Sequence, residues 1–254
     1  MGEQNAPAGQ GPMTATPATR VLGGVAVLAT VVALLLGLVV SPKDVVQGDA
    51  VRLLYVHVPV IWIAYGSFGL TSLASALYLW RGRRRADSGR HYDRLAGAAA
   101  ECGVLFTGLT LISGALWGKI TWGTYWQWDA RLTTTVLLFI TYIGYLALRR
   151  LPADPTVRSK RSAIMALASF VNVPIVHFSV DWWRTLHQQE SFGLGEPEIT
   201  GEMLWSLLFS TLTMTIVAAW LMVHRYRVIR LEEMLDDEGL CAAIEARQAE
   251  AVGS

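Results

Sequence analysis

The sequence is poor in charged residues for a chain of 254 amino acids. Asp, Glu, Lys and Arg together make up 16% of it, whereas soluble globular domains carry about 25%. Hydrophobic residues account for 53% of the chain, and the mean hydropathy is +0.39. The composition therefore argues against an ordinary soluble domain and favours a protein whose solvent is a lipid bilayer.

Cysteine is also scarce. The chain has two cysteines, Cys102 in an apolar segment and Cys241 in a polar segment near the C-terminus. Neither belongs to a CxxC pair, and the sequence has no CxxCH motif. Thiol–disulfide exchange and the covalent attachment of a c-type haem to this chain are therefore unsupported.

Long apolar runs are abundant by contrast. Six candidate membrane-spanning segments cover residues 21–40, 54–80, 95–116, 133–148, 163–178 and 203–223. A helix rises 1.5 Å per residue, so about 20 residues cross a hydrocarbon layer of about 30 Å. The fourth and fifth segments are shorter, so they need some flanking residues to cross the hydrocarbon layer. We predict an all-α, polytopic integral membrane protein with six transmembrane helices.

The regions outside these segments are polar. Residues 1–20 are rich in Ala, Pro, Gly and Thr and have neither a basic start nor a small-residue cleavage signal. We expect a disordered cytoplasmic tail there, without a cleaved signal peptide. Residues 21–223 are the predicted membrane domain. Residues 224–254 mix opposite charges at helical spacing, which predicts a partly solvated, cytoplasmic C-terminal helix.

The distribution of Lys and Arg predicts the orientation in the membrane. Fourteen of these residues lie in one set of connections, after the second, fourth and sixth segments, and five lie in the opposite set. Because Lys and Arg concentrate on the cytoplasmic side, both termini are expected to be cytoplasmic. The connection between the third and fourth segments then faces outward.

That outward connection, residues 117–133, is unusually aromatic. It holds four of the ten tryptophans, Trp117, Trp122, Trp126 and Trp128. Trp122, Trp126 and Asp129 are spaced i, i+4 and i+7, which predicts a short helix with all three on one face. With Trp128 and Arg131 beside it, this face would suit a large, planar, apolar ligand that carries negative charges. A belt of tryptophans at the membrane–water interface is the alternative.

Three of the five histidines, His57, His177 and His187, fall on the same side as the Trp-rich stretch, whereas His91 and His224 fall on the cytoplasmic side. His57 and His187 belong to the two outer connections that flank the stretch. Two neutral imidazoles and a flat apolar floor meet the needs of a six-coordinate haem iron. A zinc or copper site made by the three outer histidines is an alternative, although no carboxylate–His pattern accompanies them. Cations that could pair with haem propionates are Arg52, Lys119, Arg131 and Arg184.

Three motifs carry a resemblance to a known family. WGTYWQWDARLT resembles the tryptophan-rich WWD signature of the haem-handling membrane proteins of cytochrome c maturation. YVHVPVIW and PIVHFSVDWWRTLHQ resemble the CcmC branch of these proteins, and the likeness covers residues 45–205. The resemblance implies that His57 and His187 are the axial ligands of haem b. It assigns the haem platform to Trp117, Trp122, Trp126, Trp128 and Asp129; His177 matches a family position but is not carried over as a ligand.

The resemblance also implies a role and partners. Such a protein lies in the cytoplasmic (inner) membrane, holds haem at its periplasmic face and presents it to a CcmE-type haem chaperone. It works with a CcmD-type small membrane protein and the ABC transporter subunits CcmA and CcmB. This sequence has LHQQ at 186–189 where related sequences usually have LHQG. Acidic residues follow at Glu190, Glu196, Glu198 and Glu202, and these departures bear on the chaperone-docking surface more than on the iron ligation.

Two other functions remain as alternatives. A cytochrome c haem lyase is an enzyme of the same wider superfamily, but those chains are usually larger and have additional histidine pairs within the membrane. A permease subunit of an ABC-type haem exporter needs a polar path through the spans, and the main ionisable residue within them is Glu101. The sequence therefore favours haem binding and delivery over catalysis of a bond change.

Overall fold

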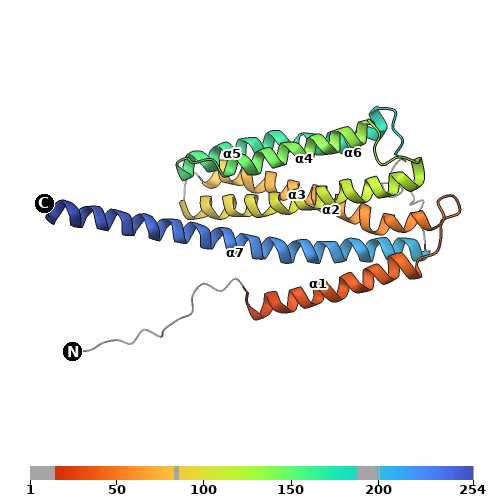
Figure 1. The fold of residues 1–254 in the computed structure, drawn as a ribbon, viewed down its shortest axis with the longest axis horizontal. Helices are drawn as coiled ribbons and strands as arrows, with labels where there is room; N and C mark the ends of the chain where they lie inside the picture. Colours follow the sequence, from red (N-terminus) through yellow and green to blue (C-terminus); the bar gives the residue numbers. More distant parts are fainter. Residues whose placement is uncertain (1–14, 83–85, 188–198, 200, 254) are drawn as a thin grey trace.

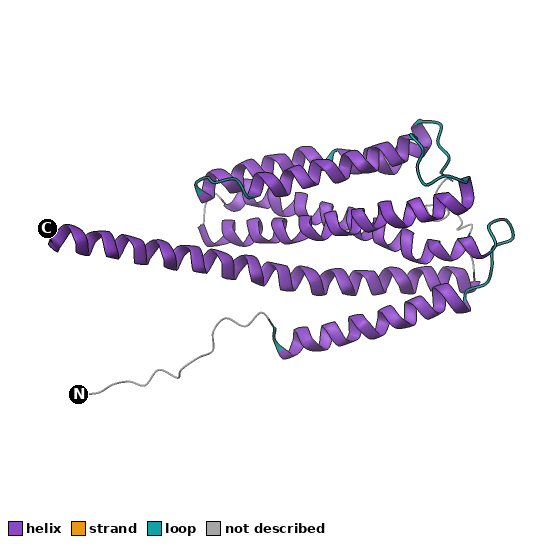
Figure 2. Cartoon of the chain, viewed as in Figure 1, coloured by secondary structure: helices purple, strands orange, loops and turns teal. Residues whose placement is uncertain are grey.

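The structure is a computed structural model that describes residues 15–82, 86–187, 199 and 201–253. It is helical, and no β-strand occurs in these residues (Figure 2). The α-helices are α1 (Pro17–Leu35), α2 (Leu54–Leu77), α3 (Ala86–Trp122), α4 (Ala130–Arg149), α5 (Pro155–Phe170), α6 (Asn172–Trp182) and α7 (Gly201–Gly253). Short π-helical turns extend α1 over Leu36–Val40 and α2 over Tyr78–Gly82, and a 3-10 turn, Asp49–Leu53, precedes α2.

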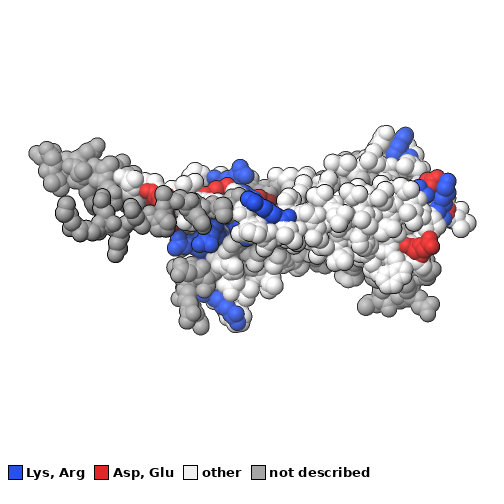
Figure 3. Space-filling view, turned by 90° about the horizontal axis from the view of Figure 1, so that it is seen from below, with Lys and Arg blue, Asp and Glu red and all other residues white. Residues whose placement is uncertain are grey.

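Within the described residues, six helical segments are long and apolar enough to cross a membrane. They are Pro17–Val40, Asp49–Gly82, Gly89–Trp122, Ala130–Arg149, Pro155–Trp182 and Gly201–Gly239. The prediction of an all-α protein with six transmembrane helices is confirmed. On the face seen in Figure 3, the middle of the described bundle shows no charged side chain, and the charges gather towards its two ends.

Two element boundaries differ from the sequence expectation. The predicted fifth segment, 163–178, is divided between α5 and α6 at Val171. Pro174 lacks a backbone N–H and cannot continue the hydrogen-bond ladder of α5. At this break the Asn172 side chain donates a hydrogen bond to the carbonyl of Thr134 on α4, at 3.0 Å. At the C-terminus, residues 224–253 continue α7 as one helix rather than forming a separate element.

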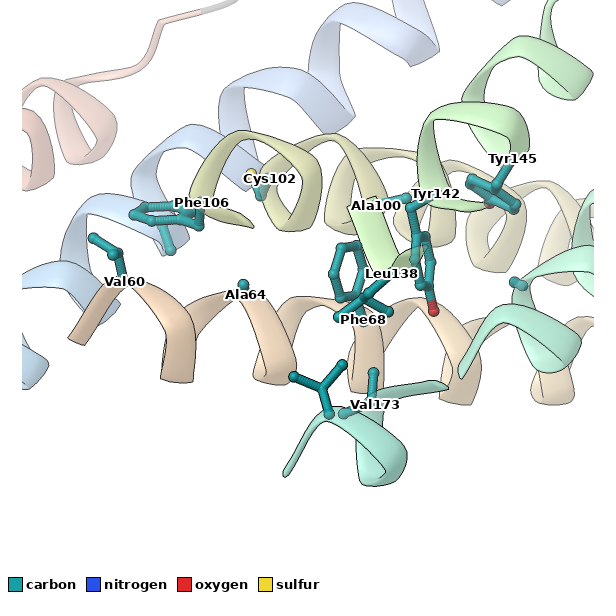
Figure 4. Close-up of a cluster of buried hydrophobic side chains, with 13 residues drawn as sticks. Val60, Ala64, Phe68, Ala100, Cys102, Phe106, Leu138, Tyr142, Tyr145 and Val173 are labelled. Atoms are coloured by element: carbon teal, nitrogen blue, oxygen red, sulfur yellow. The ribbon is translucent and has the colours of Figure 1, made fainter. Parts of the chain in front are cut away.

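The helices form a layered bundle. The α2–α3 pair occupies the middle, α4, α5 and α6 cover one side, and α7 covers the other, with α1 packed on α7 (Figure 1). In the core the rings of Phe68 and Tyr142 stack with centroids 3.7 Å apart (Figure 4). A Cβ at Gly103 would lie 2.3 Å from the Phe68 ring, so a glycine on α3 is what lets this aromatic pair form.

The connections alternate between the two ends of the bundle (Figure 1). The loops 41–48, 123–129 and 183–187 lie at one end, which we call the cavity end. At the other end, which we call the arginine-rich end, ion pairs join α7 to α3. Arg94 pairs with Glu233 at 2.7 Å, and Arg225 pairs with Glu101. The predicted division of Lys and Arg between two sets of connections therefore corresponds to two opposite ends of the bundle.

The buried ion pair between Asp93 and Arg149 is expected to stabilise the fold. Arg149 Nη1 and Nη2 each lie 2.8 Å from the Asp93 carboxylate, and the two side chains are 13% and 6% exposed. Asp93→Ala leaves the buried guanidinium without its carboxylate, although the Tyr145 hydroxyl and the backbone carbonyl of residue 93 remain near it, and we expect a loss of about 3–5 kcal/mol in the free energy of unfolding. Unfolding of the detergent-solubilised chain measures it.

The matched control is Asp237→Ala, which breaks the exposed pair with Arg90 and should cost less than about 1 kcal/mol. Equal losses in the two variants would contradict the prediction.

Candidate functional site

A cavity of about 530 Å³ opens among the helix ends at the cavity end of the bundle. Its walls come from α2, α3, α4, α6, α7 and the loops 41–48, 123–129 and 183–187. Aliphatic and aromatic side chains dominate the lining. Its imidazole and indole groups are His57, His177, His187, Trp62, Trp117, Trp122 and Trp126. A cavity of this size and character suits one organic ligand.

The Trp-rich stretch has a different backbone from the predicted short helix. Helix α3 continues to Trp122, Gly123 adopts a left-handed conformation with φ +77°, and residues 124–129 are not helical. Asp129 then caps the N-terminus of α4. The short-helix prediction is therefore wrong, because a left-handed glycine ends one helix and a capping Asp begins the next. Trp122 and Trp126 still reach the same cavity, from the helix and from the loop respectively.

His57 lies in the first turn of α2, and a residue of α3 contacts its ring. Its Nδ1 is 3.1 Å from the Ser113 hydroxyl, and that hydroxyl donates to the carbonyl of Leu109 at 2.8 Å. Ser113 therefore accepts from His57, which makes Nδ1 the protonated nitrogen and leaves a lone pair on Nε2. A Cβ at Gly114 would lie 2.9 Å from His57 Cε1, so this glycine provides the space that the ring occupies.

His187 lies in the 183–187 loop, with its ring 4.9 Å from that of Trp122 in a T-shaped arrangement. Its Nδ1 is 3.4 Å from Asp129 Oδ2 and 3.4 Å from Thr185 Oγ1. Burial lowers the pKa of His187, and the Asp129 carboxylate opposes this shift without cancelling it. The imidazole is therefore neutral near pH 7, the form that binds a metal.

Asp129 fixes the 183–187 loop onto the start of α4. Its Oδ1 accepts from the N–H of Leu132 at 3.0 Å, and its Oδ2 accepts from the N–H of Leu186 at 2.9 Å and from the Thr185 hydroxyl. Burial alone would raise the pKa of Asp129, but these hydrogen bonds hold it below its ordinary value. Asp129 is absent from the lining of the cavity and contacts His187, and its part in a haem platform stays a prediction.

The predicted cations are distributed unevenly. Arg131 lines the cavity and donates to the carbonyl of His177 at 2.8 Å. Arg52 lies outside the lining, donates to the carbonyl of Leu38 at 2.6 Å and pairs with Asp49. The other two candidates, Lys119 and Arg184, are exposed and also lie outside the lining.

Four tryptophans were predicted for the platform, and three of them, Trp117, Trp122 and Trp126, line the cavity. Trp117 Nε1 donates to the Gln47 side chain at 3.0 Å, which ties α3 to the 41–48 loop. Trp128 is 81% exposed and meets only the edge of Trp126 among the described rings, with centroids 5.5 Å apart. Its part in a platform stays a prediction.

Several residues of the site were not singled out from the sequence. Ser113 and Gly114 support His57, and Thr185 supports His187. Ser113 precedes Trp117 by four residues and so shares its helix face, which is the one available signal. His177 lines the cavity as a third imidazole, edge-on to Tyr65 at 6.4 Å between ring centroids.

The zinc or copper alternative finds no support in the geometry. Across the part of the chain that the structure describes, no three His, Cys, Asp or Glu side chains gather as a metal-binding cluster. The acidic residues Glu190, Glu196 and Glu198, which bear on the predicted chaperone-docking surface, lie outside the described residues.

Comparison with known proteins identifies the family. The model of the CcmC family, described as "Heme exporter protein C", matches residues 6–238. The heme exporter protein C of Bradyrhizobium diazoefficiens is 39% identical over 194 residues, which are 74% of this chain and 71% of that protein. That of Haemophilus influenzae is 39% identical over 199 residues, 78% of each chain. A ccmC-like mitochondrial protein of Arabidopsis thaliana, named for cytochrome c biosynthesis, is 33% identical over 231 residues, 90% of this chain and 84% of its own. The chain therefore belongs to the CcmC family of membrane proteins, which handle haem in cytochrome c maturation.

Proposed function

We propose that this protein binds haem b in the cavity, with His57 and His187 as axial ligands, and delivers it to a CcmE-type haem chaperone. One observation carries the proposal. Two histidines from different elements line one cavity, and each has its Nδ1 engaged by a side chain that leaves Nε2 as the donor atom. This is the arrangement by which proteins prepare an imidazole to bind a metal.

The cavity fits a haem in size and chemistry. Its volume of about 530 Å³ and its aliphatic and aromatic lining suit a planar macrocycle. Trp117, Trp122 and Trp126 would contact the porphyrin, and Arg131 is the cation placed to pair with a propionate. When bound, haem supplies an iron with two axial positions for imidazole nitrogens. The protein's own groups orient the two rings, exclude water from the apolar walls and hold the Nδ1 protons.

The charge distribution supports an extracytoplasmic position for the site. The arginine-rich end carries most of the Lys and Arg residues of the connections, and such residues concentrate on the cytoplasmic side of membranes. With that end inside, the cavity end and its haem face the periplasm of the cytoplasmic membrane, where a haem chaperone can reach it. Six spans then put both termini in the cytoplasm.

The proposed partners follow from family membership. The relatives of this chain are named heme exporter protein C, and we propose that it works with CcmA- and CcmB-type ABC transporter subunits and a CcmD-type small membrane protein. Haem delivery is favoured over a permease path through this chain. Glu101, the main ionisable residue of the spans, is paired with Arg225 on α7 at the arginine-rich end and does not line the cavity.

The experiment that tests the proposal is purification of the full chain with the haem that it acquires in the cell. We expect about one haem b per chain, a low-spin spectrum typical of two imidazole ligands, and transfer of the haem to a purified CcmE-type chaperone. Absorption spectroscopy gives the spin state, and the pyridine haemochrome assay gives the stoichiometry. Membranes that lack the chain serve as the control. A chain that purifies folded but without haem, or with high-spin haem alone, would contradict the proposal.

A further inference from the structure

The two cavity histidines are supported at Nδ1 by chemically different partners. His57 meets the hydroxyl of Ser113 at 3.1 Å, which is a neutral acceptor. His187 meets Asp129 Oδ2 at 3.4 Å, which belongs to a carboxylate. A charged acceptor behind an imidazole increases the electron density on the opposite nitrogen, whereas a hydroxyl does so much less. The pair is therefore electronically asymmetric.

Hydrogen-bond donors fix the position of the Asp129 carboxylate and favour its negatively charged form. Three donors surround it, the N–H groups of Leu132 and Leu186 and the hydroxyl of Thr185. It also sits at the N-cap of α4, where the helix dipole favours a negative charge. Its side chain is only 7% exposed, so solvent screens its effect on His187 weakly.

The hydrogen bonds around His187 Nδ1 indicate which ring nitrogen of His187 carries the proton. The Thr185 hydroxyl donates to Asp129, and its oxygen accepts from the backbone N–H of His187 at 3.1 Å. Both groups near Nδ1 of His187 are consequently acceptors, and Nδ1 must carry the proton. The lone pair of Nε2 then receives the polarising effect of the carboxylate.

We infer that the two axial ligands are unequal: His187, positioned and polarised by Asp129, is the ligand that stays on the iron, and His57 is the ligand that dissociates when haem is handed over or an external ligand binds. This inference rests on the proposed haem-binding function. Asp129 is a positioning residue in it, since it acts through His187. The arrangement lets one side of the haem be released while the other remains held.

Carbon monoxide tests which ligand leaves. Added to the ferrous, haem-loaded full chain, it must displace one imidazole, and the C–O stretching frequency reports the donor strength of the ligand that stays opposite. We expect Asp129→Asn to shift this frequency, because His187 is still bound. Ser113→Ala should leave the frequency at the wild-type value, because His57 is no longer on the iron. A shift in Ser113→Ala with none in Asp129→Asn would overturn the inference.

The reduction potential tests the charge itself. Asp129→Asn retains an oxygen acceptor but removes the negative charge, so the preference for ferric over ferrous haem should fall about tenfold, a rise of about 59 mV for a one-electron couple. Asp181→Asn is the matched control, since Asp181 is an exposed carboxylate near the end of α6. A potential in Asp129→Asn equal to that of the control would contradict the inference.

These outcomes are distinguishable from failure of the haem-binding proposal. If His57 and His187 do not hold haem, the wild-type chain lacks the low-spin spectrum from the start. If they do hold haem but are equivalent, the wild-type spectrum is low-spin and the Asp129 and Ser113 variants change the C–O frequency alike.

Discussion

Replacement of either His57 or His187 by alanine is expected to abolish the low-spin haem spectrum of the purified chain. With His57 and His187 as the proposed axial ligands, each substitution would remove one iron–nitrogen bond, so that the iron would be five-coordinate or haem would be lost during purification. The affinity for haem should fall at least 100-fold in each variant, because the remaining imidazole and the apolar walls must hold the group alone. Absorption spectra and haem titration of the solubilised variants measure both effects.

Two matched variants make this prediction specific. His224→Ala removes a histidine at the arginine-rich end, next to Trp220, and should leave the spectrum unchanged. His177→Ala removes the third imidazole of the cavity and should retain a low-spin spectrum, because His177 is not one of the proposed ligands. Unchanged spectra in both the His57 and His187 variants, or loss of the low-spin form in His177→Ala, would refute the ligand assignment.

The second large effect is expected from the indoles that line the cavity. The double variant Trp122→Ala, Trp126→Ala should weaken haem binding about 100-fold or more, since truncation of a buried Trp at a binding site costs on the order of 2 kcal/mol. Axial ligation should remain bis-histidine in the haem that is retained. Trp122 also packs edge-on against His187, so its removal should loosen the position of this proposed ligand as well.

Trp128→Ala is the matched variant for the double substitution. It removes an indole of the same loop that is 81% exposed and outside the cavity lining. We expect less than a tenfold change in haem affinity, measured by titration of haem-free protein. An effect of Trp128→Ala as large as that of the double variant would mean that the 123–129 loop closes over haem in a different conformation, against the present assignment.

The fold was predictable from the sequence to the level of helix number and class. Each span is a long apolar run, and such runs have one structural solution in a bilayer, so the six segments required no tertiary information. The break at Val171 was hidden because the segment 163–178 is largely apolar, and Asn172 and Pro174 were its local signals. The contacts that hold the long α7 against α3, such as Arg94–Glu233, join residues far apart in the sequence.

The site was predictable in its chemistry and less so in its geometry. The cavity tryptophans stand out by residue type within residues 117–133, and His57 and His187 stand out because they lie in the two outer connections that flank this stretch. The partners of the two histidines do not, because Ser113 is 56 residues from His57 and Asp129 is 58 residues from His187. The short helix expected over Trp122–Asp129 failed because i, i+4 spacing does not reveal that Gly123 adopts a left-handed conformation.

Asp129 connects these observations. This residue, which the family resemblance assigns to the haem platform, caps α4, anchors the 183–187 loop and contacts His187. Arg131, two residues later, reaches the carbonyl of His177 on α6 and lines the cavity. The start of α4 is therefore where the Trp-rich stretch, the 183–187 loop and α6 meet, and it determines how the cavity wall is assembled.

The most direct test of this account is a density map of the haem-loaded chain at a resolution that locates the iron and its axial ligands. We expect one haem in the cavity, with iron bonded to Nε2 of His57 and to Nε2 of His187. Iron bonded to His177, or a haem bound outside the cavity end of the bundle, would contradict it.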